Sequence, residues 1–272
     1  MKKNKKKSNT KTTKNNYIIF LFLILCCATL IIVLNRNRFY KVEDRTTNVK
    51  EEKKKDIDMI TTVGWIKVQG TTIDEPIIYY SPDYDDSSDT EGKEKFSYTD
   101  IKEEQLYNKV YIAGHNILNL SKHPQINKKT FNRFEDLMAF IYYDFAKKNK
   151  YIQYTVNNED YVYKIYAVRL YKHYTDIEND PEITYNEKEI EKYARNTKKD
   201  SLYNYNVKVT GKDNLITLVT CTRFYGAGEH SAFVVDARML RKGEKIRNYS
   251  VKKTDKYKKV EKILKGDEGN ES

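Results

Sequence analysis

Eight short apolar segments rich in β-branched and aromatic residues follow one another along the chain, and they limit the possible folds more than any other feature. Most alternate apolar and polar residues or form short continuous apolar runs, and turn residues such as Gln69-Gly70 bound them. Eight such segments within about 180 residues indicate a closed or nearly closed β-barrel or a β-sandwich. The segments are VGWIKV (63–68), PIIYY (76–80), KVYIAG (109–114), YIQYTV (151–156), YVYKIYAVRLY (161–171), VKVTG (207–211), LITLVTC (215–221) and AFVVDARML (232–240).

Two stretches with helical spacing interrupt the expected strands. One helix is predicted over residues 132–147, where apolar residues recur at intervals of three and four. A second is predicted to begin near Asp180-Pro181 or at Thr184, where Thr184 and Glu187 resemble a capping box. The sequence therefore predicts a mainly β domain with a few peripheral helices.

Ahead of the expected strands, Tyr17–Leu34 runs for eighteen residues without a charge, a proline or a glycine. This length just suffices for a helix to cross a bilayer, and the segment is apolar all round, unlike an amphipathic core helix. Residues 1–16 hold seven lysines and no acid, so the positive-inside rule predicts a cytoplasmic N-terminus. No small-x-small cleavage site follows the segment. The sequence therefore predicts a single-pass signal anchor in the cell membrane, with the rest of the chain outside the cytoplasm.

The predicted organisation downstream of this anchor has three parts. Residues 35–57 are polar and are expected to form a stalk, residues 58–242 the folded domain, and residues 243–272 a charged C-terminal tail. Residues 1–16 carry seven of the eleven net positive charges, so the remainder carries only +4. We find no glycine-rich phosphate loop, zinc-ligand spacing or nucleic-acid motif in the sequence. We therefore expect no cofactor, no metal and no nucleic-acid partner, and membrane lipid only around the anchor.

The expected topology separates one of the three cysteines from the other two. Cys26 and Cys27 lie inside the apolar segment, so Cys221 is the single cysteine expected outside the membrane, where it has no partner for an internal disulfide. Two interpretations remain open on this evidence: a buried apolar residue that ends a strand, or a reactive thiol. Nucleophilic chemistry would also need an acid or base and a donor for the developing oxyanion.

Four histidines are candidates for that acid or base. His115 directly follows the expected strand 109–114 and lies between Gly114 and Asn116, where the end of a barrel would present a catalytic side chain. An ordinary surface histidine in a turn is the alternative for His115 at this point. The other three histidines, which lie in polar or glycine-rich stretches, are His123, His173 and His230.

The run Thr217–Cys221 (TLVTC) resembles the TLxTC signature of sortases, the membrane-anchored cysteine transpeptidases of Gram-positive bacteria. Further stretches resemble class B sortases in the same order along the chain, and together the similarity covers roughly residues 58–242. These stretches are VGWI (63–66), GT (70–71) and PI (76–77) of the opening strands, AGHN (113–116) of the catalytic histidine, the F..L helix at 131–137, and the helix near 184–196.

The resemblance implies an eight-stranded sortase β-barrel in which Cys221 is the nucleophile and His115 the general acid or base. The thiol would attack the Thr–Gly or Thr–Asn bond of a sorting motif on a secreted protein and form a thioacyl enzyme. An amine of a peptidoglycan precursor or a pilin lysine would then resolve it. The resemblance thus favours the reactive thiol. A catalytically degenerate sortase-fold scaffold and a secreted cysteine protease remain alternative interpretations.

One residue of the family pattern is missing. The family has an arginine on the strand after the cysteine, and the corresponding position here is Ala232. Arg238 shares the face of Ala232, but six residues along a strand span about 20 Å. Arg223, two residues after the cysteine, is our candidate for stabilising the oxyanion and positioning the substrate. His230 with the backbone N–H of Thr222 is the alternative.

Overall fold

Short strands with alternating side chains dominate the structure, which is a computed structural model. It describes residues 62–79, 97–99, 106–128, 133–174 and 186–266. The predicted membrane anchor lies outside these ranges, as do the basic N-terminal tail and the stalk. Among the helices within the described ranges, none is both long enough and apolar enough to cross a bilayer.

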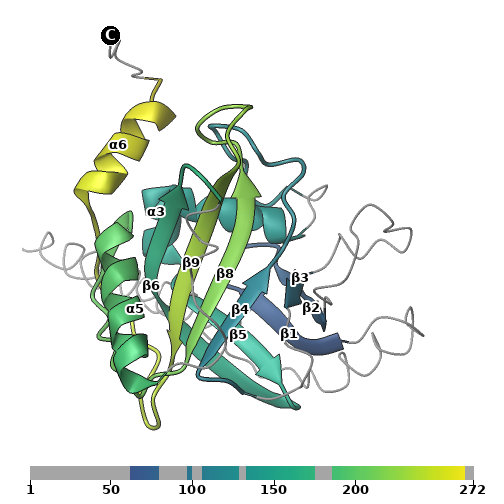
Figure 1. The fold of residues 1–272 in the computed structure, drawn as a ribbon, viewed down its shortest axis with the longest axis vertical. Helices are drawn as coiled ribbons and strands as arrows, with labels where there is room; N and C mark the ends of the chain where they lie inside the picture. Colours follow the sequence, from purple (N-terminus) through teal and green to yellow (C-terminus); the bar gives the residue numbers. More distant parts are fainter. Residues whose placement is uncertain (1–61, 80–96, 100–105, 129–132, 175–185, 267–272) are drawn as a thin grey trace, which may run out of the picture. The chain divides into compact units, whose positions relative to one another are not determined.

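The barrel strands are β1 (Thr62–Val68), β2 (Asp74–Tyr79), β3 (Ser97–Thr99), β4 (Lys109–Ala113), β5 (Tyr151–Val156), β6 (Glu159–Tyr171), β8 (Leu215–Thr222) and β9 (Ser231–Met239). Within the described part of the chain they form one closed barrel in the order β1-β2-β3-β4-β8-β9-β6-β5 (Figure 1). The pairs β2–β3 and β4–β8 are parallel, whereas the other pairs are antiparallel. The predicted mainly β barrel is therefore confirmed.

Seven of the eight predicted strand segments form barrel strands. The eighth prediction, VKVTG (207–211), is wrong, because these residues form no strand. Two of its backbone carbonyls accept hydrogen bonds from side chains and not from a neighbouring strand. Lys198 donates to the carbonyl of Val207, and the guanidinium of Arg238 donates to the carbonyl of Lys208. The alternating valines there, Val207 and Val209, pack against the core although the segment pairs with no strand.

Three short strands escaped the sequence prediction because three residues are too few to show a period of two. One is β3, which closes the barrel between β2 and β4. The other two, β7 (Tyr203–Tyr205) and β10 (Val251–Lys253), pair with each other in a separate two-stranded sheet.

The helix predicted over 132–147 is present as two pieces. A 3₁₀ helix, η3 (Arg133–Ile141), is followed by α3 (Tyr143–Lys148), and the extended backbone of Tyr142 separates them. Apolar residues of η3 are fully buried in the barrel core. The helical spacing in this stretch therefore identified the buried face correctly but not the break.

The second predicted helix is α5 (Glu187–Asp200). Its capping box is formed by Asn186 and Glu189, two residues later than the pair expected at Thr184 and Glu187. The side chain of Asn186 accepts a hydrogen bond from the backbone N–H of Glu189 at 3.1 Å, and the Glu189 carboxylate accepts one from the backbone N–H of Asn186 at 3.0 Å.

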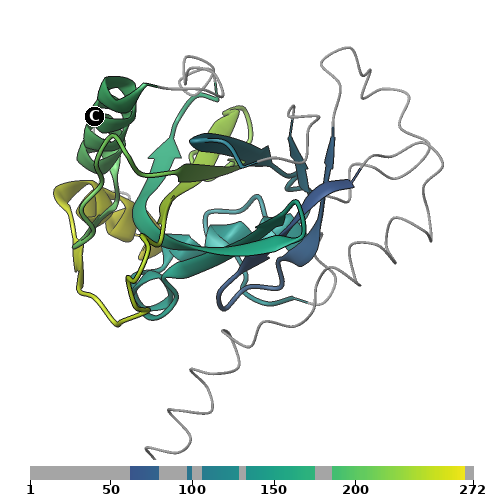
Figure 2. The same cartoon turned by 90° about the horizontal axis from the view of Figure 1, so that it is seen from below.

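The segment expected as a charged tail from residue 243 onward is folded as far as residue 266. It contributes β10 and α6 (Asp255–Leu264), whose side chains Tyr257 and Val260 are buried. The rings of Tyr203 and Tyr257 lie 5.0 Å apart between centroids. Figures 1 and 2 show α5 and α6 on the side of the barrel away from β1 and β2.

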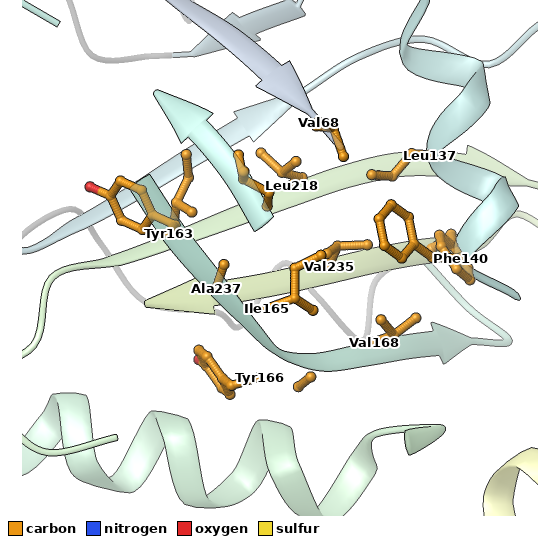
Figure 3. Packing of buried hydrophobic residues seen from close by; sticks show 14 of the residues in the cluster. Val68, Leu137, Phe140, Tyr163, Ile165, Tyr166, Val168, Leu218, Val235 and Ala237 are labelled. Carbon is orange, nitrogen blue, oxygen red and sulfur yellow. The ribbon is translucent and has the colours of Figure 1, made fainter. Parts of the chain in front are cut away.

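The core lies inside the barrel, where strands and η3 contribute alternate side chains. Leu218 of β8 and Val235 of β9 are register partners, and both are fully buried with Leu137 of η3 (Figure 3). Val219 of β8 and Val234 of β9 belong instead to a second apolar cluster. Because side chains alternate between the two faces of a strand, this second cluster marks the outer face of β8 and β9.

Candidate active site

Cys221 is the next-to-last residue of β8, and among the eight residues of that strand it is the exposed one. β-branched residues on either side of it favour an extended backbone. By alternation its thiol shares the outer face of the sheet with Val219. The sequence left open whether this cysteine is buried or accessible, and the structure places it in contact with solvent.

His115 lies two residues beyond the end of β4, which runs parallel to β8. The last register pair of these strands is Ala113 with Val219, so two further residues on each chain bring His115 to the level of Cys221. Ala113, two residues before His115, and Val219, two residues before Cys221, share one face of the sheet. The structure thus brings the two residues selected from the sequence to adjacent strand ends.

Gly114 is the residue that allows the chain to pass from β4 to His115. A Cβ at this position would lie 2.2 Å from Cγ of Phe134, so no larger residue fits without displacing the ring. The backbone N–H of Gly114 donates to the carbonyl of Val219 at 3.1 Å, and its carbonyl accepts from the hydroxyl of Thr220 at 2.7 Å. The approach of η3 to the strand end therefore fixes the backbone directly before the histidine.

Desolvation controls the ionisation of the thiol. Although the side chain of Cys221 is accessible, the surrounding protein removes enough water to raise the pKa of the thiol above its ordinary value. A thiol with a raised pKa is protonated at neutral pH. Its proton must therefore leave during nucleophilic attack, which calls for a base at the neighbouring strand end.

A cavity of about 440 Å³ opens at the thiol and contains two further candidates from the sequence. Arg223 and His230 both line it, whereas His115 lies outside the lining, beside the strand end. No sequence pattern pointed to Tyr174, which follows β6 and is brought here by the pairing of β6 with β9. The lining residues are Asn116, Leu120, Tyr174, Cys221, Thr222, Arg223, His230 and Ser231.

Ala232 is the register partner of Cys221 on β9, so the position expected for an arginine lies directly across from the thiol. Ala232 is fully buried, and Tyr171 and Tyr174 pack against the cluster that contains it. Aromatic side chains thus cover the position where the family arginine would lie.

Two arginines near β8 and β9 differ in whether their guanidinium is accessible to a ligand. The backbone N–H of Arg223 donates to the carbonyl of Leu120 at 3.2 Å, and its side chain is exposed and lines the cavity at the thiol. Arg238 pairs with Leu215 at the opposite end of β8, and its guanidinium binds Glu244. Arg238 is therefore remote from the thiol, in agreement with the strand-length argument.

The remaining histidines are exposed. His123 lies in the loop after β4, and its backbone N–H donates to the hydroxyl of Ser121 at 3.2 Å. His173 follows β6 and lies 3.4 Å from the carboxylate of Glu229 in the loop that carries His230. Across the described ranges, no cluster of three or more His, Cys, Asp or Glu side chains is arranged to hold a metal ion.

An accessible cysteine at one strand end, with a histidine on the parallel neighbour, defines a β-barrel enzyme of the cysteine acyl-transfer class. The model of the sortase domain matches residues 66–240 of this chain. Sortase B of Listeria monocytogenes is 31% identical over 198 residues, which cover 67% of this chain and 73% of that protein. Sortase B of Staphylococcus aureus is 28% identical over 173 residues, which cover 60% of this chain and 64% of that protein.

Solved structures of class B sortases share the fold. The Clostridium perfringens sortase B structure has a TM-score of 0.55 at 21% identity and covers 72% of this chain and 100% of that chain. A Staphylococcus aureus sortase B–substrate complex has a TM-score of 0.54 at 20% identity and covers 76% of this chain and 90% of that chain. The chain therefore belongs to the sortase family, with class B sortases among its relatives, and is an enzyme of the cysteine transpeptidase type.

Proposed function

We propose that this chain is a membrane-anchored sortase of the class B type that cleaves the sorting motif of secreted proteins through a thioacyl intermediate on Cys221. The observation that carries the proposal is the parallel pairing of β4 with β8, because His115 follows the end of one strand and the exposed thiol lies near the end of the other. The motifs TLVTC and AGHN lie at these same two strand ends.

In the first half-reaction, the sulfur of Cys221 attacks the carbonyl carbon of the scissile peptide bond while the imidazole of His115 takes the thiol proton. The carbon–nitrogen bond then breaks, and the imidazolium gives that proton to the leaving amine. In the second half-reaction, an acceptor amine attacks the thioester and gives one proton to the imidazole. The imidazolium returns the proton to the departing sulfur.

Arg223 is the proposed donor to the oxyanion that forms in both half-reactions. Its guanidinium is accessible, lines the same cavity as the thiol and carries a permanent charge. The position opposite the thiol, Ala232, offers no side-chain donor. His230 with the backbone N–H of Thr222 is the alternative donor set, since both residues also line this cavity.

The partners and the location belong to the same proposal. Two structural neighbours are sortase B complexes, one with substrate and one with triglycine. We propose secreted proteins with a C-terminal sorting motif as substrates, and a peptidoglycan precursor or pilin lysine as the amine acceptor. Residues 17–34 would anchor the enzyme, with the N-terminus in the cytoplasm and the barrel outside.

The test is to incubate the full chain in detergent with a panel of sorting-motif peptides and an amine acceptor, and to follow the thioacyl adduct by intact mass. We expect adduct formation and transfer by the wild type, no adduct with Cys221→Ala, and a loss nearly as large with His115→Ala. His123→Ala, in the same loop as His115 but exposed and outside the lining of the cavity, is the matched control and should retain activity. Turnover by Cys221→Ala would disprove the proposal.

The burial of Ala232 opposite the thiol favours a second candidate, a degenerate sortase-fold scaffold that binds sorting motifs or wall fragments without cleaving them. A thiol-reactive substrate analogue distinguishes the two functions. Binding of peptide or wall fragments with no labelling of Cys221 would establish the scaffold. Labelling followed by transfer would establish the enzyme.

A further inference from the structure

The ladder between β4 and β8 changes its character at the catalytic strand ends. In a parallel pair the bonds are evenly spaced, so the donation from Gly114 N–H to the carbonyl of Val219 should be followed by one from the backbone N–H of Asn116 to the carbonyl of Cys221. Instead, the side-chain amide Nδ2 of Asn116 donates to that carbonyl at 2.9 Å. The backbone at Asn116 therefore lies farther from β8 than a paired strand would, by about the length of the Asn116 side chain. The amide of that side chain still bonds the segment of His115 to the carbonyl of Cys221.

The amide of Asn116 has little freedom to turn. Its Nδ2 also donates to the carbonyl of Asn119 at 3.1 Å, and its Oδ1 accepts from the backbone N–H of Asn119 at 3.0 Å. Both amide hydrogens and one acceptor position are thus in use, and only 7% of the residue is exposed. The bond to Cys221 consequently has a fixed direction as well as a fixed length.

The loop beyond His115 is held from its other side by a buried carboxylate. Oε1 of Glu135, a fully buried residue of η3, accepts the backbone N–H of Ile117 at 2.6 Å and that of Leu118 at 2.8 Å. The side chain of Asn119 donates to the backbone carbonyl of Glu135 at 3.0 Å. Because η3 packs in the barrel core, these bonds hold the loop rigidly against the core. Asn116 in turn fixes the loop relative to the strand that carries the thiol.

We propose that Asn116 is a positioning residue whose amide sets the separation between His115 and Cys221. This inference rests on the proposed function, because it assigns a role within that reaction. A displacement of about 1 Å between reacting groups costs about 10²-fold in rate. Removal of the Asn116 amide should therefore lower kcat strongly, and by more than a comparable loss of stability elsewhere in the loop would.

The chain offers a matched control in Asn119, the same residue type in the same loop and 2% exposed, whose side chain bonds to Gln125 and Glu135 but not to the thiol strand. The experiment compares Asn116→Ala and Asn119→Ala in the full chain for kcat and KM with a sorting-motif peptide. It also measures thermal stability and the rate at which iodoacetamide alkylates Cys221. We expect both variants to lose stability, and Asn116→Ala alone to lose about 10²-fold in kcat with an unchanged alkylation rate.

Asn116→Gln guards against a variant that fails to fold. It keeps an amide donor but lengthens the spacer by one methylene, so it should fold, alkylate normally and still lose kcat. Equal kcat losses in Asn116→Ala and Asn119→Ala, or full activity in Asn116→Gln, would overturn the inference and leave the proposed function intact. A wild type that forms no thioacyl adduct would overturn both.

Discussion

The two ends of the β8–β9 pair use arginine in opposite ways. At one end Leu215 pairs with Arg238, whose side chain is 3% exposed and whose guanidinium lies 2.6 Å from the carboxylate of Glu244. At the other end Cys221 pairs with Ala232, and the nearby Arg223 is exposed. One end binds its cation to a carboxylate of the protein, whereas the other leaves its cation available to a ligand.

This difference indicates where the pair of strands contributes to stability and where it contributes to chemistry. A buried guanidinium must be paired, because an uncompensated buried charge is strongly destabilising. An exposed guanidinium adds little to stability, but it can donate to a charge that develops on a bound substrate. Substitutions at the two ends should therefore affect different measurements.

The largest expected effect is at the thiol end. Arg223→Ala should lower kcat by about 10²–10³-fold, because it removes the proposed donor to the oxyanion. The free energy of unfolding should change by less than about 0.5 kcal/mol, as is usual for exposed positions. Steady-state cleavage of a sorting-motif peptide and urea denaturation measure the two quantities.

Arg238→Ala is the control at the opposite end, and it should lose stability while its kcat is retained. If Arg223→Ala keeps the wild-type kcat, Arg223 has no role at the oxyanion. The alternative donors, His230 and the backbone N–H of Thr222, would then be tested by His230→Ala.

The next effect in size is at the paired end. Glu244→Gln removes the negative charge bound by Arg238 and by Lys164, which lies 2.9 Å away. We expect a loss of about 2–3 kcal/mol in the free energy of unfolding at pH 7, because the buried guanidinium loses its charged partner. Thermal and urea unfolding check this value. Unchanged stability would mean that water solvates Arg238 as well as the carboxylate does.

The same ion pair predicts a dependence of stability on pH. The hydrogen bond from Arg238, with a further one from Lys164, holds the pKa of the Glu244 carboxyl well below its usual value of 4.5. A lowered pKa in the folded state gives stability that is complete above about pH 4.5 and is lost as the pH falls toward the folded value. Urea unfolding of the wild type from pH 7 to pH 3 should show this loss. Glu244→Gln should flatten the curve, and an equally steep curve would contradict the assignment.

The smallest effect concerns the thiol itself. Because burial raises the pKa of Cys221 above its usual value of 9.0, alkylation by iodoacetamide should still be accelerating as the pH passes 9. Cys221→Ala supplies the blank for the other two cysteines of the chain. A rate that levels off below pH 8 would show that a nearby cation stabilises the thiolate. The cation at the thiol end would then already be paired with a negative charge of the protein, as Arg238 is at the opposite end.

The sequence carried enough information for the main parts of the site. TLVTC and AGHN are local motifs, and the strand pattern around them led to a barrel, so Cys221 and His115 could be selected before their pairing was known. The absence of an arginine at Ala232 was also visible. These features depend on residues close together in the chain or on a short, recognisable pattern.

Other features depend on contacts that no local pattern records. The bond from Asn116 to Cys221 joins residues 105 positions apart, and Tyr174 reaches the cavity only through the pairing of β6 with β9. The fold of residues 243–266 was missed because many lysines and acids surround the few residues that are buried there, such as Val251 and Tyr257. Composition in that stretch describes the exposed face, whereas the packing depends on the buried one.

The parallel pairing of β4 with β8 also affects how this chain can change during evolution. The reactive groups sit just past the last bonds shared by two adjacent strands, and about a hundred residues, among them β5, β6 and α5, connect those strands. Insertions in loops of that connection would leave the strand register unaltered, provided that η3 keeps its place in the core. Surface regions could therefore diverge toward new substrates while the spacing of thiol and imidazole is inherited unchanged.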